Sequence, residues 1–172
     1  MLAWVFVFLR EAMRSFFFRH PWLFRLGMNL WPPMLFCGIK LVELSKDFRY
    51  ARVDLKWKKT TRNINGSQYG GSLFSMTDPF YALLLFGCLG FHRYHIWDSS
   101  AEIDFISPGI GRLTAEFHLD DEQLHEIKQK TAEGDKYFPE FIVYIKDQKG
   151  TLVAKVTRRV YVRLKSKYRN PS

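Results

Sequence analysis

The chain has 172 residues, of which 47% are hydrophobic and 25% are charged. This length allows one domain with a sizeable core, and the composition is ordinary for a globular protein. The two cysteines, Cys37 and Cys88, lack metal-ligand spacing, which excludes a disulfide framework or zinc site and indicates buried thiols of a reducing compartment. The formal net charge of +9 predicts an anionic partner such as nucleic acid, a lipid surface or a phosphorylated ligand.

Residues 1–36 form an N-terminal extension rich in aromatic side chains and arginine. We expect one helix up to about Arg19 and a second that starts near Pro21 and is stopped by Pro32 and Pro33. The first apolar run lacks a basic start and contains an arginine, so it does not resemble a cleaved signal peptide. No stretch reaches the roughly 18 to 20 apolar residues that a membrane-spanning helix needs.

The composition of this extension is typical of a helix lying in a bilayer interface. The alternative is a helix packed against the outside of the domain or against a partner subunit. We favour this alternative because the segment is apolar on more sides than an interfacial helix normally is.

From residue 38 onward the spacing of apolar residues changes from a helical period to a period of two residues. Residues 49–57 place Ala51, Val53 and Leu55 on one face, and residues 112–120 alternate in the same way. Strict alternation predicts half-buried antiparallel strands. We expect further strands near residues 39–45, 94–106, 138–146 and 152–164, and a short surface helix at 121–133 with Leu124 and Ile127 inward.

The stretch 71–87 is apolar on nearly every side, which predicts a core helix around which a sheet must wrap. The helix follows the second predicted strand. The expected architecture is therefore α+β, with a curved antiparallel sheet wrapped around one long central helix, plus the N-terminal helices.

Two adjacent glycines, Gly70 and Gly71, open this helix. The first amides of a helix have no internal partner, and glycine lets a ligand approach them closely, so they predict a hole for an oxyanion or carbonyl oxygen. Asp78 follows Gly71 by two turns, which is roughly 10 Å along the axis. One helix cannot hold a carbonyl with its amide and deliver its own carboxylate to the same carbon, so the spacing predicts a composite site at a dimer interface. Pro79 should bend the helix just beyond Asp78, either to aim the carboxylate or as a simple packing kink.

Residues 63–78 read N-x-x-G-x-x-Y-G-G-x-x-x-x-x-x-D. This pattern resembles the signature of hotdog-fold thioesterases of the phenylacetate-degradation type, and the order of the predicted elements is similar as well. The likeness extends through "IWDSSAEIDFISPGIGRLTAEF" and covers roughly residues 38–164. A bacterial branch of that superfamily, known only as a domain of unknown function, is similar in "NLWPP" and "YGGSLFSMTDPFY". The resemblance implies that residues 37–172 form a hotdog domain that binds acyl thioesters.

The resemblance also implies roles for single residues. Gly71, or its neighbour Gly70, would polarise the thioester carbonyl through its amide. Asn63 would position the carbonyl or the attacking water, and Asp78 of the other chain would act as general base or nucleophile. Tyr69, a further expected substrate contact, stands where the family usually has histidine, a departure that either changes acidity there or only fills space.

Asp98 aligns with a position where these enzymes often hold serine or threonine beside the catalytic acid. A second carboxylate there would raise one pKa of the pair if both face the site, which would either tune Asp78 or mean that ordinary hydrolysis has been lost. Asp98 could instead pair with Arg93 or another cation at the edge of its strand. The remaining expected substrate contacts are Gly66, Ser99 and the cations Lys58, Lys59 and Arg62, which suit the phosphates of coenzyme A.

Simpler interpretations stay open for several residues. Asp78 could be a structural carboxylate within the dimer, and Asn63 could form a turn before the helix. Arg158 interrupts the apolar side of the last strand, where we expect a bulge or an edge position rather than a phosphate contact. His92 and His95 lack a complete ligand set, so no metal is expected.

The leading hypothesis is an acyl-coenzyme A or acyl-carrier-protein thioesterase for a fatty acyl chain, with no cofactor besides the coenzyme A of its substrate. We expect a cytoplasmic homodimer or homotetramer, with peripheral contact at the inner membrane through residues 1–31 left open. The alternatives are a non-catalytic protein that binds acyl chains or lipids, and a purely structural module. Nucleic acid is not expected, because the cations are dispersed.

Overall fold

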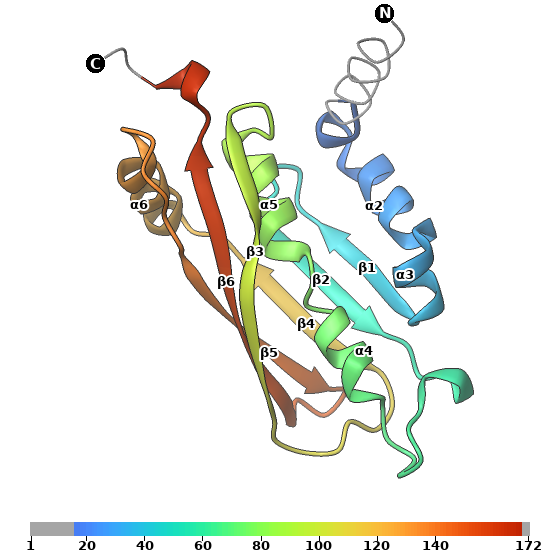
Figure 1. The fold of residues 1–172 in the computed structure, drawn as a ribbon. Coiled ribbons are helices and arrows are strands. Elements are labelled where there is room, and N and C mark those ends of the chain that lie inside the picture. Colours follow the sequence, from blue (N-terminus) through green and yellow to red (C-terminus); the bar gives the residue numbers. More distant parts are fainter. Residues whose placement is uncertain (1–15, 170–172) are drawn as a thin grey trace, which may run out of the picture.

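The computed structural model describes residues 16–169. Figure 1 shows a curved sheet with helices lying against it. The strands are β1 (Ile39–Leu44), β2 (Tyr50–Leu55), β3 (Tyr94–Phe105), β4 (Leu113–His118), β5 (Glu140–Asp147) and β6 (Leu152–Leu164). The helices are α2 (Pro21–Leu30), α3 (Pro32–Phe36), α4 (Gly70–Ser75), α5 (Phe80–Leu89) and α6 (Asp121–Thr131), with short 3-10 turns at Lys59–Thr61 and Ser166–Tyr168.

The six strands form one antiparallel sheet in the order β1-β2-β4-β5-β6-β3. Each predicted strand is present, with ends that differ by at most two residues. Ala51, Val53 and Leu55 are buried, as the alternation predicted, and so are Leu124 and Ile127 on α6. The predicted α+β architecture, a sheet wrapped around a central helix, is confirmed.

The central helical segment, Gly70–Leu89, is interrupted between α4 and α5. The long central helix predicted over 71–87 is present, but the bend expected just beyond Asp78 is a break into two helices. Pro79 has no amide hydrogen to bond back to Ser75, and the amides of Thr77 and Asp78 bond only three residues back, to Phe74 and Ser75, at 3.2 Å each. The break therefore begins before Asp78 and places it in a turn rather than on a helix.

The same segment corrects a second expectation. Gly70–Leu89 is long and apolar enough to cross a membrane, by length and composition alone. However, 56% of its most apolar window is buried against the rest of the domain, and Phe80, Leu84 and Leu85 pack in the main core. It is the core helix of the sheet.

The N-terminal helices close one edge of the sheet. Asn29 of α2 accepts a hydrogen bond from the amide of Leu41 at 2.7 Å and donates one to its carbonyl oxygen at 3.0 Å. Arg25 donates to the carbonyl oxygen of Val42 at 2.8 Å. These contacts satisfy backbone groups of β1 that an edge strand otherwise leaves open to pairing. Within the described residues, α2 therefore packs on the outside of the domain, the alternative that we favoured.

Two further points concern the predicted helices of the extension. Pro32 and Pro33 begin the short helix α3 instead of only stopping the previous one, because proline suits the first turn of a helix. Residues 16–19 are helical, whereas the start of the predicted first helix lies outside the described residues.

The opposite edge of the sheet is open. Within residues 16–169, β3 pairs only with β6, and its side chains Trp97 and Phe105 are 51% and 60% exposed. A bulge between Asp98 and Ser100 shifts its register. A long, partly apolar edge strand of this kind is a ready surface for pairing with another chain.

Both cysteines are free and half-buried. Burial raises the pKa of the Cys88 thiol to about 11, so this thiol stays protonated at neutral pH. This agrees with an inert thiol rather than a nucleophile.

Candidate functional site

A buried arginine stands where the central helix breaks. Arg158 of β6 is only 2% exposed, and its guanidinium donates to the carbonyl oxygen of Phe74 at 2.9 Å and to Thr77 Oγ1 at 2.9 Å. It also lies over the Phe74 ring, 4.7 Å from the centroid. Arg158 thus fastens the turn between α4 and α5 to the sheet.

The expectation of a bulge or edge position for Arg158 was wrong. β6 lies inside the sheet, between β5 and β3, and Arg158 pairs in register with Phe141 and Ala101. The interruption of the apolar pattern was visible in the sequence, but the partners of the side chain were not. Arg158 is the residue of the site that sequence reasoning missed.

Asp78 lies at the surface next to this arginine. Its Oδ2 is 3.5 Å from Nη1 of Arg158, and the two side chains are 52% and 3% exposed. Asp78 also lines a cavity of about 240 Å3, whose other walls include Trp31, Met34, Phe74 and Pro79. A cation held inside the fold thus faces a carboxylate that is open to a ligand.

Asp98 belongs to the same group of charges. Burial raises its pKa, Asp78 raises it further, and the nearby Arg158 opposes this by lowering it. The bulge at Ser99 follows Asp98, and bulges commonly re-aim side chains next to functional sites. Among the ion pairs of the described residues, none joins Asp98 to Arg93. We call Asp78, Asp98 and Arg158 the charged cluster. Ser99 itself is exposed.

The predicted amide hole begins at Gly70. Within the described residues, the amides of Gly70 and Gly71 have no hydrogen-bond partner, whereas those of Ser72 and Leu73 bond to the carbonyl oxygen of Tyr69 at 2.9 and 3.3 Å. The Tyr69 ring lies against Gly71, where an added Cβ would overlap it. Tyr69 is 59% exposed, so its ring can move away from the two free amides.

Asn63 forms the turn that leads into the glycines. Its Oδ1 accepts hydrogen bonds from the amides of Asn65 at 3.0 Å and Ser67 at 3.1 Å, and its Nδ2 donates to Ser67 Oγ at 2.9 Å. Gly66 has φ of 75° in this turn, a conformation that favours glycine. These contacts agree with the simpler interpretation of Asn63.

One chain does not bring the two halves of the site together. Asn63 and Gly70 line a cavity of about 460 Å3 that also includes Phe105 and Pro108, while Asp78 lines a different cavity. The separation agrees with the argument from spacing that one helix cannot supply both the amides and the carboxylate to one carbonyl.

The three predicted phosphate-binding cations lie on the surface before the glycine motif. Lys59 and Arg62 are exposed and Lys58 is half-buried. The Arg62 guanidinium stacks over the Trp57 ring, 4.0 Å from its centroid. This contact orients Arg62.

The fold is similar to solved structures of thioesterases. A protein of unknown function from Pseudomonas aeruginosa, PA5026, described as a probable thioesterase, superposes with a TM-score of 0.74 at 21% identity over 83% of this chain and 95% of its own. The PaaI protein of the Escherichia coli phenylacetic acid degradation operon gives 0.55 at 21% identity, over 75% and 82%. The thioesterase HI1161 of Haemophilus influenzae gives 0.59 at 12% identity, over 79% and 85%. These likenesses confirm the hotdog fold.

A comparison with curated proteins gives no match. Residues 20–162 match the family model of the domain of unknown function DUF4442. The matched region contains the charged cluster, the glycine motif and the helices that cover β1. The chain therefore belongs to the DUF4442 family, on a hotdog fold that it shares with thioesterases.

Proposed function

We propose that this protein hydrolyses acyl thioesters at a site shared by two protomers, with Asp78 as the general base or nucleophile. The single observation that carries the proposal is the placement of Asp78, which is half-exposed on a cavity and held from inside by the buried Arg158. The thioesterase fold of the structural neighbours supports the same chemistry.

The two-protomer site is supported by the open edge of β3 and by the separation of Asp78 from Gly70 within one chain. Pairing of two β3 edges would continue the sheet across a two-fold axis. Each protomer would then offer its free glycine amides to a carbonyl that the partner's carboxylate attacks. Asn63 would act by fixing the turn that presents these amides.

In the general-base form, the Asp78 carboxylate takes a proton from water while the water oxygen bonds to the acyl carbon. The carbonyl oxygen gains negative charge, which the amides of Gly70 and Gly71 stabilise. The bond from carbon to sulfur then breaks, the thiolate takes the proton from Asp78, which restores the carboxylate, and a carboxylic acid leaves. Lys58, Lys59 and Arg62 would bind the phosphates of coenzyme A, whereas the same positive surface would meet the acidic helix of a carrier protein.

We expect the purified protein to release free thiol from acyl-coenzyme A thioesters, with a rate that saturates with substrate. The measurement is thiol release with a series from butanoyl- to hexadecanoyl-coenzyme A. A folded protein, checked by circular dichroism, that releases no thiol from any member of the series or from acyl carrier protein would sink the proposal.

A second candidate function is lipid binding at the inner membrane without hydrolysis. The observation in its favour is an apolar patch on α2 and α3, whose exposed side chains are Trp22, Leu26, Leu30, Leu35 and Phe36. Arg19, Arg25 and Lys46 line a hollow beside Trp22. Exposed apolar side chains with cations beside them are typical of surfaces that bind anionic bilayers.

This candidate predicts that the protein sediments with vesicles that contain phosphatidylglycerol. The double variant Trp22→Ser, Leu26→Ser should bind roughly tenfold more weakly or worse, because each side chain buries apolar surface in the bilayer. Ile142→Ser, at an exposed position on β5, is the matched control and should bind like the parent. If the parent and the double variant sediment equally with the vesicles, this patch does not bind the membrane.

A further inference from the structure

An apolar groove lies between the N-terminal helices and the central helix. It has a volume of about 440 Å3, and its walls include Phe17, Phe24, Gly27 and Trp31 on one side and Leu83 and Phe86 on the other. Its lining side chains carry no charge. A cavity of this size and character suits an apolar ligand, with any polar end kept outside.

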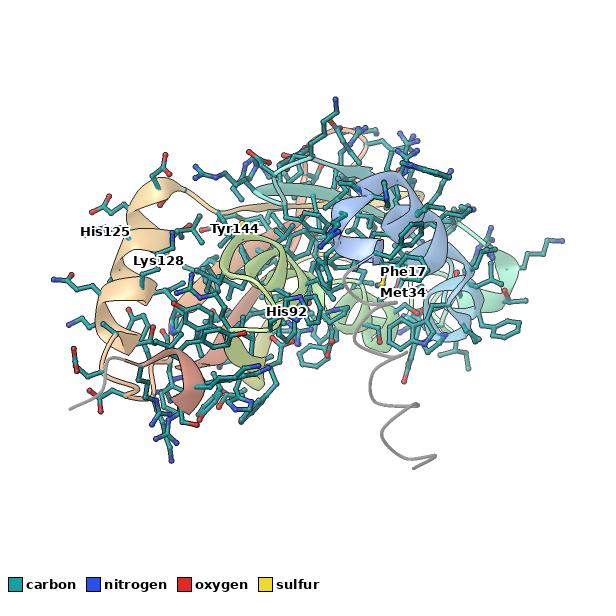
Figure 2. All side chains as sticks on the ribbon, turned by 90° about the horizontal axis from the view of Figure 1, so that it is seen from above. Phe17, Met34, His92, His125, Lys128 and Tyr144 are labelled. Atoms are coloured by element: carbon teal, nitrogen blue, oxygen red, sulfur yellow. The ribbon has the colours of Figure 1, made fainter. Side chains whose placement is uncertain are left out.

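The groove lies next to the cavity of Asp78. Trp31, at the junction of α2 and α3, lines both. In Figure 1, α2 and α5 lie at one level, and α3 and the break before α5 lie below them. Figure 2, seen from above, shows Phe17 of the groove and Met34 of the Asp78 cavity on the same side of the molecule.

We infer that this groove binds the acyl chain of the substrate, and that the preferred chain has roughly ten or more carbons. The inference rests on the proposed function, since it places the thioester carbonyl at Asp78. The chain would run from Asp78 past Trp31 along α5 to Phe86. The absence of charge along the groove keeps the thioester at the Asp78 end.

The length follows from helix geometry. Phe86 is eight residues beyond Asp78, and most of this distance is on α5, so the groove extends roughly 12 Å at 1.5 Å per residue. An extended chain advances about 1.2 Å per single bond, judged from the reach of an extended backbone. About ten bonds therefore reach Phe86. Shorter chains leave the aromatic end unfilled and lose the gain from burying each methylene.

The occupant is an acyl chain rather than a second protein. The neighbouring cavity holds Asp78, the one exposed carboxylate of the charged cluster, so a ligand that spans both must bring an electrophilic or polar group to Asp78 and an apolar tail to Phe86. A fatty acyl thioester has this order of groups. Filling of the groove by another part of the chain, residues 1–15 included, would leave no room for an added ligand, and the test separates the two.

The test uses Gly27→Phe, which adds a ring at a groove position. An added Cβ at Gly27 meets only the Phe17 ring, at 3.5 Å, and glycine is a poor helix former, so the variant should fold. Gln129→Phe adds the same side chain to the exposed surface of α6. Figure 2 shows α6, with His125 and Lys128, on the opposite side of the molecule from Phe17.

We expect Gly27→Phe to lower kcat/KM for dodecanoyl-coenzyme A by roughly tenfold or more, because several methylenes lose their site, and to change butanoyl-coenzyme A less than about twofold. Gln129→Phe should match the parent for both substrates. The parent should also bind dansyl-undecanoic acid with a rise in fluorescence that dodecanoyl-coenzyme A reverses, and Gly27→Phe should not.

The outcomes separate the two proposals. If kcat/KM does not depend on chain length and is the same for Gly27→Phe and the parent, the groove does not bind the acyl chain, and the thioesterase proposal still stands. If the parent does not hydrolyse any thioester, and only Gly27→Phe loses binding of the probe, the groove is supported as an acyl-chain site and the thioesterase proposal is wrong. A parent that neither binds the probe nor prefers long chains overturns the inference, as it must if the protein fills its own groove.

Discussion

Asp78→Asn is expected to lower kcat/KM for acyl-coenzyme A hydrolysis by roughly a hundredfold or more, the scale of lost general-base catalysis. The substitution keeps the shape of the side chain and removes its charge. Stability should change little, because Asp78 is 52% exposed and its contact with Arg158 is a single pair at 3.5 Å. The measurement is thiol release by the parent and the variant, with thermal unfolding followed in parallel.

A mixed-dimer experiment sharpens this prediction. Gly71→Val should also be inactive, because the added side chain covers the amide hole. A dimer of one Asp78→Asn chain and one Gly71→Val chain keeps one intact pair of carboxylate and hole, so refolding the two variants together should recover part of the activity. Undiminished hydrolysis by Asp78→Asn would assign the reaction to another group. Failure of the mixture to recover would argue that one chain supplies the whole site.

Arg158→Met should lower kcat more than it raises KM, because Asp78 would lose the group that holds its position. The free energy of unfolding should fall by about 1–3 kcal/mol, since the variant removes buried hydrogen bonds to Phe74 and Thr77. The loss should not exceed this range, because Thr77 Oγ1 still donates to the carbonyl oxygen of Phe74 at 2.8 Å.

The pH profile separates a structural role of Arg158 from an electrostatic one. Burial and Asp78 raise the pKa of Asp98, and Arg158 lowers it. Asp98 interacts with the charge of Asp78, the proposed base, so its ionisation should affect the reaction. Without Arg158 the pKa of Asp98 rises further, so the acidic limb of kcat/KM should move to higher pH. Arg158→Lys keeps the charge and loses the forked geometry of the guanidinium. Its acidic limb of kcat/KM should therefore lie at the same pH as that of the parent, while its free energy of unfolding is lower. If the acidic limb lies at the same pH in Arg158→Met and in the parent, the role of Arg158 is structural only.

Local patterns in the sequence determined much of the fold. Alternation of apolar residues located the strands within two residues, because the side-chain period of a half-buried strand is two. The apolar stretch after the second strand located the central helix, and Pro79 indicated that it would bend. The spacing of Gly71 and Asp78 predicted that one chain would not complete the site, in agreement with the separate cavities of Gly70 and Asp78.

Contacts between distant elements were outside the reach of these patterns. Arg158 is 80 residues from Asp78 along the chain, and its meeting with the turn depends on the strand register and the position of the break. The sequence showed a polar residue on an apolar face but could not show which groups satisfied it. The protection of β1 by Asn29 was hidden for the same reason.

The sequence by itself thus determined the hotdog-like order of elements and the residues of the glycine motif. Only the tertiary structure decided that the charges of Asp78 and Arg158 act on the pKa of Asp98, that the Tyr69 ring lies against Gly71, and that Trp31 lines both the apolar groove and the Asp78 cavity. The physical reason is that periodicity encodes which face of an element is buried. Which side chain it meets there is set by how separate elements pack, and that depends on the whole chain.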